Sequence, residues 1–404
     1  MNAQNPEPHG PLSGLLVADF SRVLAGPYCT MLLADMGATV IKVESPAGDD
    51  TRQWTPPVRD EEATYYLSVN RNKRSLTLDL GTKSDQLTAL ALARNADVLI
   101  ENFKPGGMAA FGLDYDSVAA INPGVVYASI TGFGASSPLP GYDILAQALS
   151  GLMSITGSAD GEPTKAGVAI IDVVTGLHAG LGALAALRHR DITGRGQHIE
   201  VNLLSSALSA LVNQSAAFAL GDTVPRRMGN DHPSIYPYGP FATAAGDLVI
   251  AVGNDAQFGR LAEILEIPGV ASDTRFVTAR ARSANREELR PVLQVALSCR
   301  TAVAWFDALS AASVPCAPIL DIGEAFAWAE SLGLQPLVET GSGERIMPGV
   351  RHPIRFSETP AEYPLAPPRL GADTAWAHRL LETIAGTPQK QDAAALAARE
   401  ERIA

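Results

Sequence analysis

The chain has 404 residues, 46% of them hydrophobic and 18% charged, with a formal net charge of −12 at pH 7. This is an ordinary globular composition, long enough for two or three domains, and it excludes a disordered chain. The negative charge argues against a general nucleic-acid or membrane-surface protein, so an anionic ligand must meet a local cluster of cations.

Strands and helices alternate through the first half of the chain. A strand at 15–20, a helix ending near Met36 and a strand at 39–43 form a βαβ unit, which implies a parallel sheet. The alternation continues with predicted strands at 75–80, 97–101, 125–130 and 198–201, and with predicted helices at 84–95, 115–122, 173–189 and 203–220. The fold class is therefore α/β.

The composition changes after residue 224, where Pro, Gly, Tyr and Asn become frequent. A β-ribbon is predicted at 241–253, helices across 256–312 and a rigid proline-bearing loop at 314–319. The predicted domains are the first part of a large domain at 1–225, a smaller α+β domain at 226–322 and a return segment at 323–404. The last residues, 389–404, are typical of an exposed helix or a frayed tail.

The three cysteines show neither metal-ligand spacing nor a disulfide framework. That fits a reducing cytoplasm, as does the polar start from Met1 to Pro11, which is unlike a signal peptide. No apolar run approaches the roughly 20 residues needed to span a bilayer. We expect a cytoplasmic protein with no metal site, no nucleic-acid partner and no membrane partner.

Asp172 is the lone carboxylate of the apolar run 167–177, and a helix of small residues follows it. One interpretation is an N-cap carboxylate, because Asp is a preferred cap. The other is a catalytic carboxylate at a cleft, held ionised by N–H donors and the helix dipole. Asp143, upstream, either caps a helix at 144–153 or shares a site with Asp172 in which the two carboxylates take different roles.

Two further stretches are candidates for ligand binding. The run Asn70–Ser75 holds three cations and no acid, and it is either a solvated surface run or a site for a polyphosphate. The segment Glu101–Gly106 follows the carboxyl end of a strand, where α/β sheets bind ligands. It offers Lys104 as a cation and Phe103 as a ring for an adenine or pantetheine arm, or it is a plain turn. His232, in a loop at the domain junction, either lines a site or is structural.

Several blocks of the chain resemble family III of the CoA-transferases, the CaiB/BaiF family. They occur in the family's order and extend over most of the chain. The blocks are Leu16–Pro27, Leu33–Pro46, Asn72–Asp79, Asp97–Gly106 and Thr193–Gln197.

The resemblance implies a Rossmann-like large domain with a parallel sheet, built from both chain ends, a small domain between them, and an interlocked homodimer. It implies an enzyme that moves CoA between an acyl-CoA and a free carboxylic acid, with no prosthetic group and with the CoA thioester as substrate. Asp172 matches the family's catalytic aspartate, which forms an aspartyl-acyl anhydride and then an aspartyl-CoA thioester. Backbone donors would hold the oxyanions. The implied CoA contacts are Val23, Lys73, Arg74, Asn102 and Phe103, with Lys104 as a further cation.

The chain differs from many members at one position, from the racemase branch at a second, and from an oxalate-using member at a third. Ala110 replaces an arginine, so one phosphate contact is lost or supplied by Lys104. Tyr142 replaces the histidine of the family's racemase branch, and a phenol with a reference pKa of about 10 is a poor second base. This favours transfer over α-methylacyl-CoA racemisation. Leu24 stands where an oxalate-using member has a polar residue, which argues against oxalate.

The stretch 226–258 looks more like the succinyl-CoA-using members, so succinyl-CoA or another dicarboxylyl-CoA is the favoured donor. Arg52, Arg59 and Arg226 are cations that could pair with a distal carboxylate. The predicted substrate-binding residues are Leu24, Tyr142, Asp143, Gly229, Asn230 and His232. A non-catalytic CoA-binding protein is the remaining alternative, and the intact Asp172 weighs against it.

Overall fold

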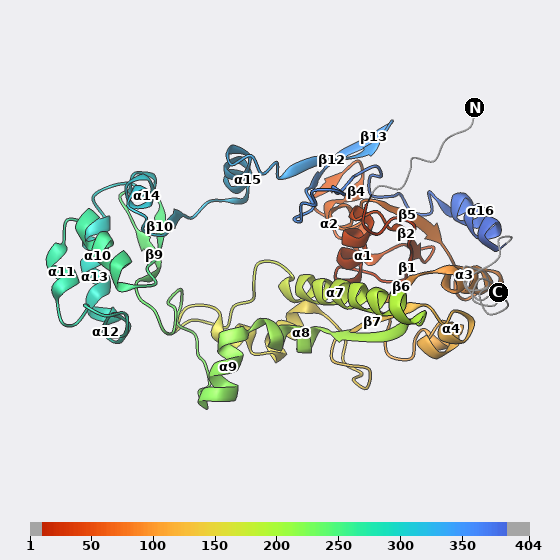
Figure 1. Cartoon of the computed structure of the whole chain (residues 1–404), viewed down its shortest axis with the longest axis horizontal. Coiled ribbons are helices and arrows are strands. Elements are labelled where there is room, and N and C mark those ends of the chain that lie inside the picture. The colour runs from red at the N-terminus through yellow and green to blue at the C-terminus, as the bar shows by residue number, and fades with distance from the viewer. Residues whose placement is uncertain (1–9, 386–404) are drawn as a thin grey trace, which may run out of the picture. The chain divides into compact units, whose positions relative to one another are not determined.

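The computed structural model describes residues 10–385, which form two compact units (Figure 1). The first unit combines the described parts of Met1–Ser150, Gly167–Ser215 and Gln335–Ala404, and the second combines Gly151–Ala166 with Ala216–Leu334. The second unit is therefore larger than the small domain expected at 226–322. The tail predicted at 389–404 lies outside the described residues.

A six-stranded sheet, parallel at every pairing, forms the centre of the first unit, as the alternating pattern predicts. The strand order is β5-β2-β1-β6-β7-β8, so the direction of winding reverses between β1 and β6. Open α/β sheets bind ligands at the carboxyl ends of the strands beside such a switch point. The strands are β1 (Leu16–Asp19), β2 (Thr39–Glu44), β5 (Lys73–Thr77), β6 (Val98–Glu101), β7 (Val126–Thr131) and β8 (Gln197–Asn202).

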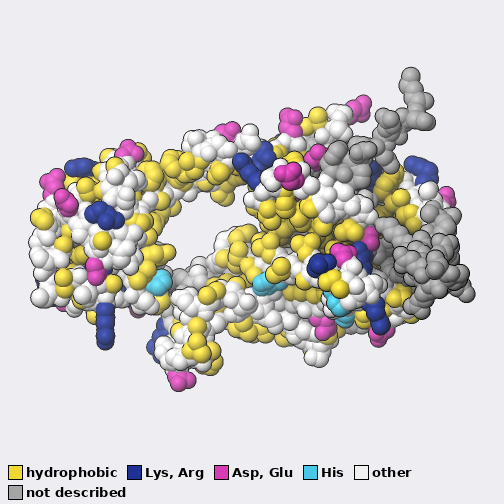
Figure 2. All heavy atoms as spheres, in the orientation of Figure 1, with side chains coloured by type: hydrophobic (Ala, Val, Ile, Leu, Met, Phe, Trp, Pro, Cys, Tyr) yellow, Lys and Arg dark blue, Asp and Glu magenta, His cyan; other side chains and the backbone are white. Residues whose placement is uncertain are grey.

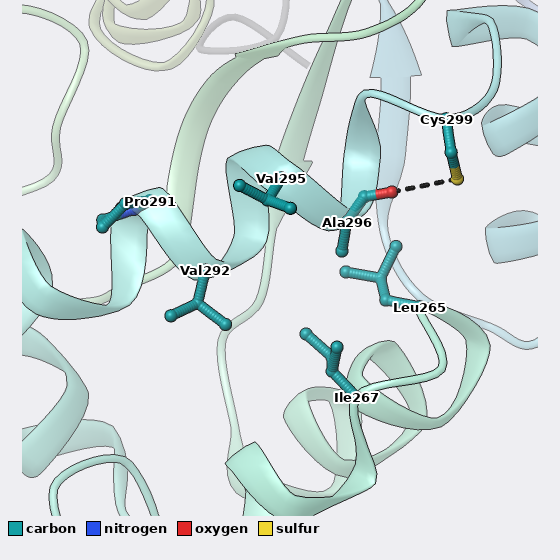
Figure 3. Close-up of a pocket in the computed structure, with 7 residues that line it drawn as sticks. All are labelled: Leu265, Ile267, Pro291, Val292, Val295, Ala296 and Cys299. Carbon is teal, nitrogen blue, oxygen red and sulfur yellow. Dashed lines mark hydrogen bonds between the residues drawn. The ribbon is translucent and has the colours of Figure 1, made fainter.

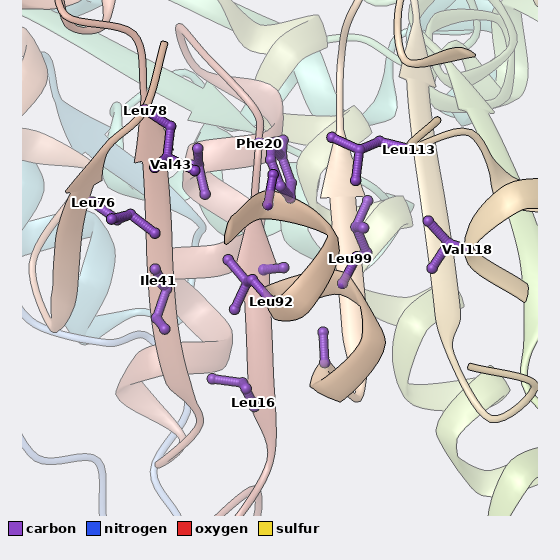
Figure 4. Close-up of a cluster of buried hydrophobic side chains, with 14 of the residues drawn as sticks. Leu16, Phe20, Ile41, Val43, Leu76, Leu78, Leu92, Leu99, Leu113 and Val118 are labelled. Carbon is purple, nitrogen blue, oxygen red and sulfur yellow. The ribbon is translucent and has the colours of Figure 1, made fainter. Parts of the chain in front are cut away.

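Helices cover both faces of this sheet. On one face, alternate strand residues such as Leu16 and Leu99 pack with Leu92 of α3 and Val118 of α4 in a large apolar core (Figure 4). On the other face, α1 packs so closely against α7 that a Cβ on Gly176 would lie 2.5 Å from a backbone oxygen of α1. The helices of this unit are α1 (Ala25–Asp35), α2 (Thr64–Ser68), α3 (Lys83–Asn95), α4 (Tyr115–Ile121), α5 (Asp143–Leu149), α7 (Ile170–Thr193), α8 (Leu203–Ala210) and α16 (Thr374–Ala385).

Short elements complete the first unit, and one predicted helix is broken. The helix predicted at 203–220 is instead α8 followed by α9 (Val212–Gly221), which meet at a bend of 82°. The short elements are η1 (Asp50–Gln53), β3 (Val58–Arg59), β4 (Glu62–Ala63), η2 (Ala109–Phe111) and the hairpin of β12 (Leu337–Ser342) and β13 (Arg345–Val350).

Within the described residues, α7 is long and apolar enough to cross a bilayer by length and composition alone. Two bent helix pairs pass the same test only when each pair is joined. The expectation that no such run exists is therefore wrong. In the first unit α7 contacts α1, β7 and β8, and this packing accounts for its small residues.

The second unit has its own core around an antiparallel sheet of order β11-β10-β9. The predicted ribbon is the pair β9 (Tyr238–Ala242) and β10 (Asp247–Ala251). The loop predicted at 314–319 instead contains an edge strand, β11 (Cys316–Pro318), because an edge position tolerates proline. The helices are α6 (Leu152–Ile155), α10 (Asp255–Ile264), α11 (Pro268–Ser272), α12 (Ala279–Ala284), α13 (Arg286–Leu297), α14 (Ala302–Ala311) and α15 (Ile322–Ser331).

Candidate active site

Asp172 lies in the first turn of α7, as its third residue. The helix begins earlier than predicted, and its N-cap is Ala169, whose side chain makes no capping hydrogen bond. The N-cap interpretation of Asp172 is therefore wrong. The Asp172 carboxylate therefore does not accept hydrogen bonds from the unpaired N–H groups at the start of its own helix.

Asp143, the first residue of α5, caps the N-terminus of α7 instead. Its Oδ1 accepts the N–H groups of Ile171 at 2.8 Å and of Asp172 at 3.0 Å, and Gln147 donates to its Oδ2 at 2.5 Å. Asp143 is the first residue of α5 rather than its N-cap, so the prediction that it caps its own helix is also wrong. The arrangement brings two carboxylates together, and it also occupies two N–H groups that could otherwise have held an oxyanion.

The Asp172 side chain is buried without compensation. The residue is 9% exposed, and burial and Asp143, with no hydrogen-bond donor, are the influences on its carboxylate among the described residues, although its oxygens are not completely enclosed. Burial and, to a lesser extent, the neighbouring Asp143 raise its pKa to about 7. The expectation that N–H donors hold it ionised is wrong, since both perturbations favour the protonated form.

Other buried carboxylates of the described chain have partners. Four have a cation within 3.1 Å, and Glu101 accepts the N–H of Phe103 at 2.8 Å. The four ion pairs are Asp19–Lys73, Asp35–Arg71, Glu44–Arg52 and Asp49–Lys42. Asp172 is the exception, and a desolvated carboxylate without a partner is a candidate for a functional group.

An apolar cluster borders the start of α7. Its buried members are Leu24, Met31 and Val69. The partly buried side chains packed against them are Val23, Tyr28, Leu32, Tyr65, Ala169 and Val173. The predicted substrate residue Leu24 is thus a buried wall residue, 7% exposed.

Tyr65 is a site residue that the sequence does not reveal. Burial first, and then the Asp172 and Asp143 carboxylates, raise its pKa to about 12, so its hydroxyl is protonated at neutral pH. The Tyr65 ring packs edge-on against Trp54 at 5.1 Å. Both residues lie in the segment between β2 and β5, where no pattern distinguishes them from other loop residues.

The turn after β1 and the end of β6 meet at the switch point. Asn102 clamps the backbone of Arg22, accepting its N–H at 2.9 Å and donating to its carbonyl at 2.7 Å. Val23 follows with a φ of 70°, a conformation that costs a β-branched residue roughly 1–3 kcal/mol. Asn102 therefore shapes this turn, and one amide hydrogen remains for a ligand. The Arg22 guanidinium lies 6.0 Å from the Phe103 ring centroid.

The cations of Asn70–Ser75 are neither a solvated run nor an open polyphosphate site. Arg71 pairs with Asp35 at 2.6 Å, Lys73 with Asp19 at 3.1 Å, and Arg74 with Asp373 at 3.0 Å. The strand predicted at 75–80 is β5, Lys73–Thr77, so Lys73 and Arg74 are strand residues.

Lys73 is correspondingly unsuited to a direct CoA contact. Its ammonium is fully buried, and it also donates to a backbone oxygen of Pro27 and to Asn70, both at 2.9 Å. Burial lowers its pKa to about 8, against the opposing effect of Asp19. Arg74 stays partly exposed, with its guanidinium 4.1 Å from the Trp376 ring centroid.

The remaining candidates differ in accessibility. Lys104 is exposed in the turn after β6, and Ala110 is exposed nearby in the chain. Tyr142 is 60% exposed at the N-cap of α5. Arg52 is occupied by Glu44 and Glu62, so it does not offer a free cation to a distal carboxylate.

Three predicted residues belong to the second unit. The Gly229 N–H donates to Gly157 at 3.1 Å, and Asn230 is exposed beside it. His232 accepts a backbone N–H from Ser234 at 3.1 Å. These contacts describe an ordered loop within that unit.

The second unit also has an apolar pocket of about 560 Å³ (Figure 3). Its lining side chains come mainly from α13, and Cys299 donates to the backbone of Ala296 at 3.2 Å. No charged side chain lines it, so it has no group for the phosphates of a nucleotide. The lining residues are Leu265, Ile267, Pro291, Val292, Val295, Ala296 and Cys299.

The chain is similar to known proteins in both sequence and structure. The model of CoA-transferase family III matches residues 12–374. The chain is 44% identical over 394 residues to a succinate–glutarate CoA-transferase of Agrobacterium fabrum, covering 95% of this chain and 98% of that protein. It is 40% identical over 368 residues to an acetyl-CoA:oxalate CoA-transferase of Acetobacter aceti, covering 89% and 93%. A CaiB/BaiF family crystal structure from Brucella suis superposes with a TM-score of 0.83 at 40% identity, covering 92% and 100%.

Proposed function

Since the chain belongs to CoA-transferase family III, we propose that it moves CoA between a dicarboxylyl-CoA, such as succinyl-CoA, and a free carboxylic acid, with Asp172 as the nucleophile. The observation that carries the proposal is the uncompensated burial of Asp172. A carboxylate without donors is poorly solvated and more basic than usual, and both properties raise its reactivity toward a thioester.

The reaction needs no proton donor and no cofactor. An Asp172 oxygen attacks the thioester carbonyl carbon, the C–S bond breaks, and CoA leaves as thiolate from an aspartyl-acyl anhydride. The thiolate then attacks the aspartyl carbonyl, which releases the first acid as carboxylate and leaves an aspartyl-CoA thioester. The acceptor carboxylate attacks that thioester, which expels CoA thiolate and forms a second aspartyl-acyl anhydride. The thiolate then attacks the new acyl carbonyl, which forms the product acyl-CoA and releases Asp172 as carboxylate. Substrates and products each contain one thioester and one free carboxylate, so the overall exchange is nearly thermoneutral.

The switch point is the proposed place for CoA. Phe103 offers a ring, Asn102 a free amide hydrogen and the exposed Lys104 a positive charge for phosphates. Arg22 is a further cation whose pair with Asp50, at 3.3 Å, is exposed and therefore weak enough for a phosphate to replace. Arg22 was not expected from the sequence, because its importance depends on contact with the end of β6. Val23 completes this group through the apolar cluster.

The substrate class rests on the relatives. One of the two curated relatives described above is named for succinate and glutarate and the other for acetyl-CoA and oxalate. The buried, apolar Leu24 gives a small dianion no polar partner, which favours a longer dicarboxylate whose second charge lies away from Asp172. A panel of acyl-CoA donors and free acids, with the CoA products measured by mass spectrometry, tests this preference for a longer dicarboxylate. A preference for oxalate over succinate and glutarate would contradict it.

The nucleophile is tested by trapping. Hydroxylamine or borohydride added during turnover should label the peptide 167–177, and Asp172→Asn should abolish both label and transfer while CoA binding persists. Transfer with an unlabelled peptide would refute the assignment.

The same samples run in deuterium oxide address racemisation, because deuterium at the substrate α-carbon without a free acid would identify an epimerase.

We also propose a homodimer in which the two copies interlock. Exposed leucines lie along α7, with exposed fractions of 46% at Leu177 and 68% at Leu181. Figure 2 shows hydrophobic side chains gathered over this region. A helix with an unpartnered apolar stripe suits burial against a second copy. Light scattering that gives a monomer at micromolar concentration would contradict the dimer.

A cytoplasmic location remains our expectation.

A further inference from the structure

The turn Ser21–Leu24 joins β1 to α1 beside the candidate nucleophile. Val23 adopts a left-handed backbone, with a φ of 70°, that β-branched residues avoid. Such a conformation persists only when the surrounding structure holds it. The residues that hold it therefore determine where Val23 and Leu24 lie.

Asp49, in the segment after β2, is one of those residues. Its two oxygens lie 3.3 and 3.2 Å from the backbone nitrogen of Val23. Thr51 donates its N–H at 3.0 Å and its hydroxyl at 2.7 Å to Oδ1, and Lys42 donates to Oδ2 at 2.9 Å. Although burial opposes ionisation, Lys42 and Thr51 lower the pKa of Asp49, so the group that holds Val23 is an anion at neutral pH.

Neighbouring peptide units of the turn are held by other side chains. Lys42 also donates to the backbone oxygen of Ser21 at 2.9 Å, and Asn102 clamps Arg22 on both sides. Lys42 and Asp49 form a fully buried ion pair. The turn is thus fixed from β2 on one side and from the end of β6 on the other.

The side chains that the turn presents belong to the site. Leu24 is a buried member of the apolar cluster, and Val23 packs against that cluster together with Tyr65 and Val173. Val173 adjoins Asp172 in α7, and burial is the main reason that the Asp172 carboxylate favours its proton. A turn that relaxed would open this wall to water.

We propose that Asp49 is a positioning residue for CoA transfer: it holds Val23 in its left-handed conformation and thereby keeps Val23 and Leu24 in the apolar wall beside Asp172. This role rests on the proposed function, because it matters only if Asp172 is the nucleophile. Asp49 itself does not touch the substrate.

A double-mutant cycle tests the proposal. Asp49→Asn keeps the shape of the side chain and removes its charge, and we expect it to lower kcat/KM for the acyl-CoA about tenfold. The acid limb of its pH–rate profile should move to lower pH, because water that enters the wall lowers the pKa of Asp172. Glycine adopts the left-handed conformation without strain. In a Val23→Gly background the same Asp49→Asn change should therefore cost about threefold or less.

Two further variants keep the test decisive. Thr51→Val removes one hydrogen bond to Asp49 and leaves the Lys42 pair, so it should give a smaller loss in the same direction even if Asp49→Asn does not fold. Asp97→Asn is the matched control, because Asp97 also holds a backbone N–H, that of Leu16 at 2.8 Å, and pairs with Arg190 at 2.9 Å. It should reduce Tm without moving the acid limb.

Equal losses from Asp49→Asn with and without the Val23→Gly substitution, or an unmoved acid limb, would overturn the positioning role. If Asp49→Asn is insoluble, equal losses from Thr51→Val in both backgrounds would do the same. Trapping of peptide 167–177 in the unaltered enzyme separates this outcome from failure of the proposed function. A labelled peptide together with equal losses rejects the role of Asp49 alone.

Discussion

Asp172→Asn should make the folded protein more stable at neutral pH while it removes transfer activity. The carboxylate is buried without a donor, and its pKa rises from a reference value of 3.8 to about 7. The folded state therefore binds the proton more tightly than the unfolded state does. The amide cannot ionise, so the variant avoids the cost of holding a charge in the apolar site.

The sign and size follow from linkage. Below about pH 4 the carboxylate is protonated in both states, and the pKa shift contributes nothing. As the pH rises from about 4 to about 7, the unfolded state ionises and the folded state does not, so stability falls by about 1.4 kcal/mol per pH unit. The rise of about three pKa units gives an upper value of about 4 kcal/mol, reached above pH 7. Screening of Asp143 by salt reduces it, and we expect about 2–4 kcal/mol.

The assay is thermal or denaturant unfolding of the unaltered protein and of Asp172→Asn between pH 4.5 and 8.5, without substrate. The difference in unfolding free energy should be small at pH 4.5, should grow to pH 7 and should then level off. The difference removes the titration of all other groups, because both proteins share them. A gain that does not vary with pH, or a variant less stable at pH 8, would refute the uncompensated burial of Asp172.

Three other changes have distinct expected results. Asp143→Asn keeps an oxygen that can accept the two α7 N–H groups but removes the negative charge beside Asp172, so the acid limb of kcat/KM should move to lower pH; an unmoved limb would contradict the coupling. Lys104→Ala should raise KM for acyl-CoA severalfold and reduce its salt dependence, with kcat little changed, and an unaltered KM at low salt would exclude Lys104 from phosphate binding. Lys73→Met should destabilise the fold by about 3–5 kcal/mol, since it leaves Asp19 buried without its cation; normal Tm with weakened CoA binding would instead restore Lys73 as a ligand residue.

The sheet could be predicted because its signals are local. Short apolar runs separated by helical patterns specify parallel strands, and all six predicted strands lie within three residues of those in the structure, five of them within one residue. The errors occur where contacts with other segments, not the local pattern, determine whether a strand forms and where it begins. β5 begins at Lys73 because buried carboxylates neutralise cations that the sequence shows as a polar run, and β11 forms because β10 offers an edge.

The sequence placed Asp172 in an apolar run and offered Asp143 as a carboxylate that shares its site, and the structure brings these two residues together. An isolated Asp in an apolar run is visible in the sequence, and Asp172 is indeed buried in the first turn of a helix. Its surroundings depend on contacts between distant segments, which one sequence does not display. Asp143 lies 29 positions away and caps α7, and the Asn102 clamp on Arg22 spans 80 positions.

The contrast between the buried carboxylates of the first unit explains why the site is where it is. Asp19 and Asp49 each accept several hydrogen bonds, including one from a lysine, and that compensation lowers the pKa of both against the effect of burial. The same fold buries Asp172 and gives it a second carboxylate, not a cation, as its charged neighbour, so its pKa moves the other way. Elsewhere in this unit, buried acids are thus neutralised by a lysine and by hydrogen-bond donors. Omitting that compensation at one position keeps a basic, poorly solvated oxygen available to a thioester, and stability and turnover are therefore opposed at residue 172.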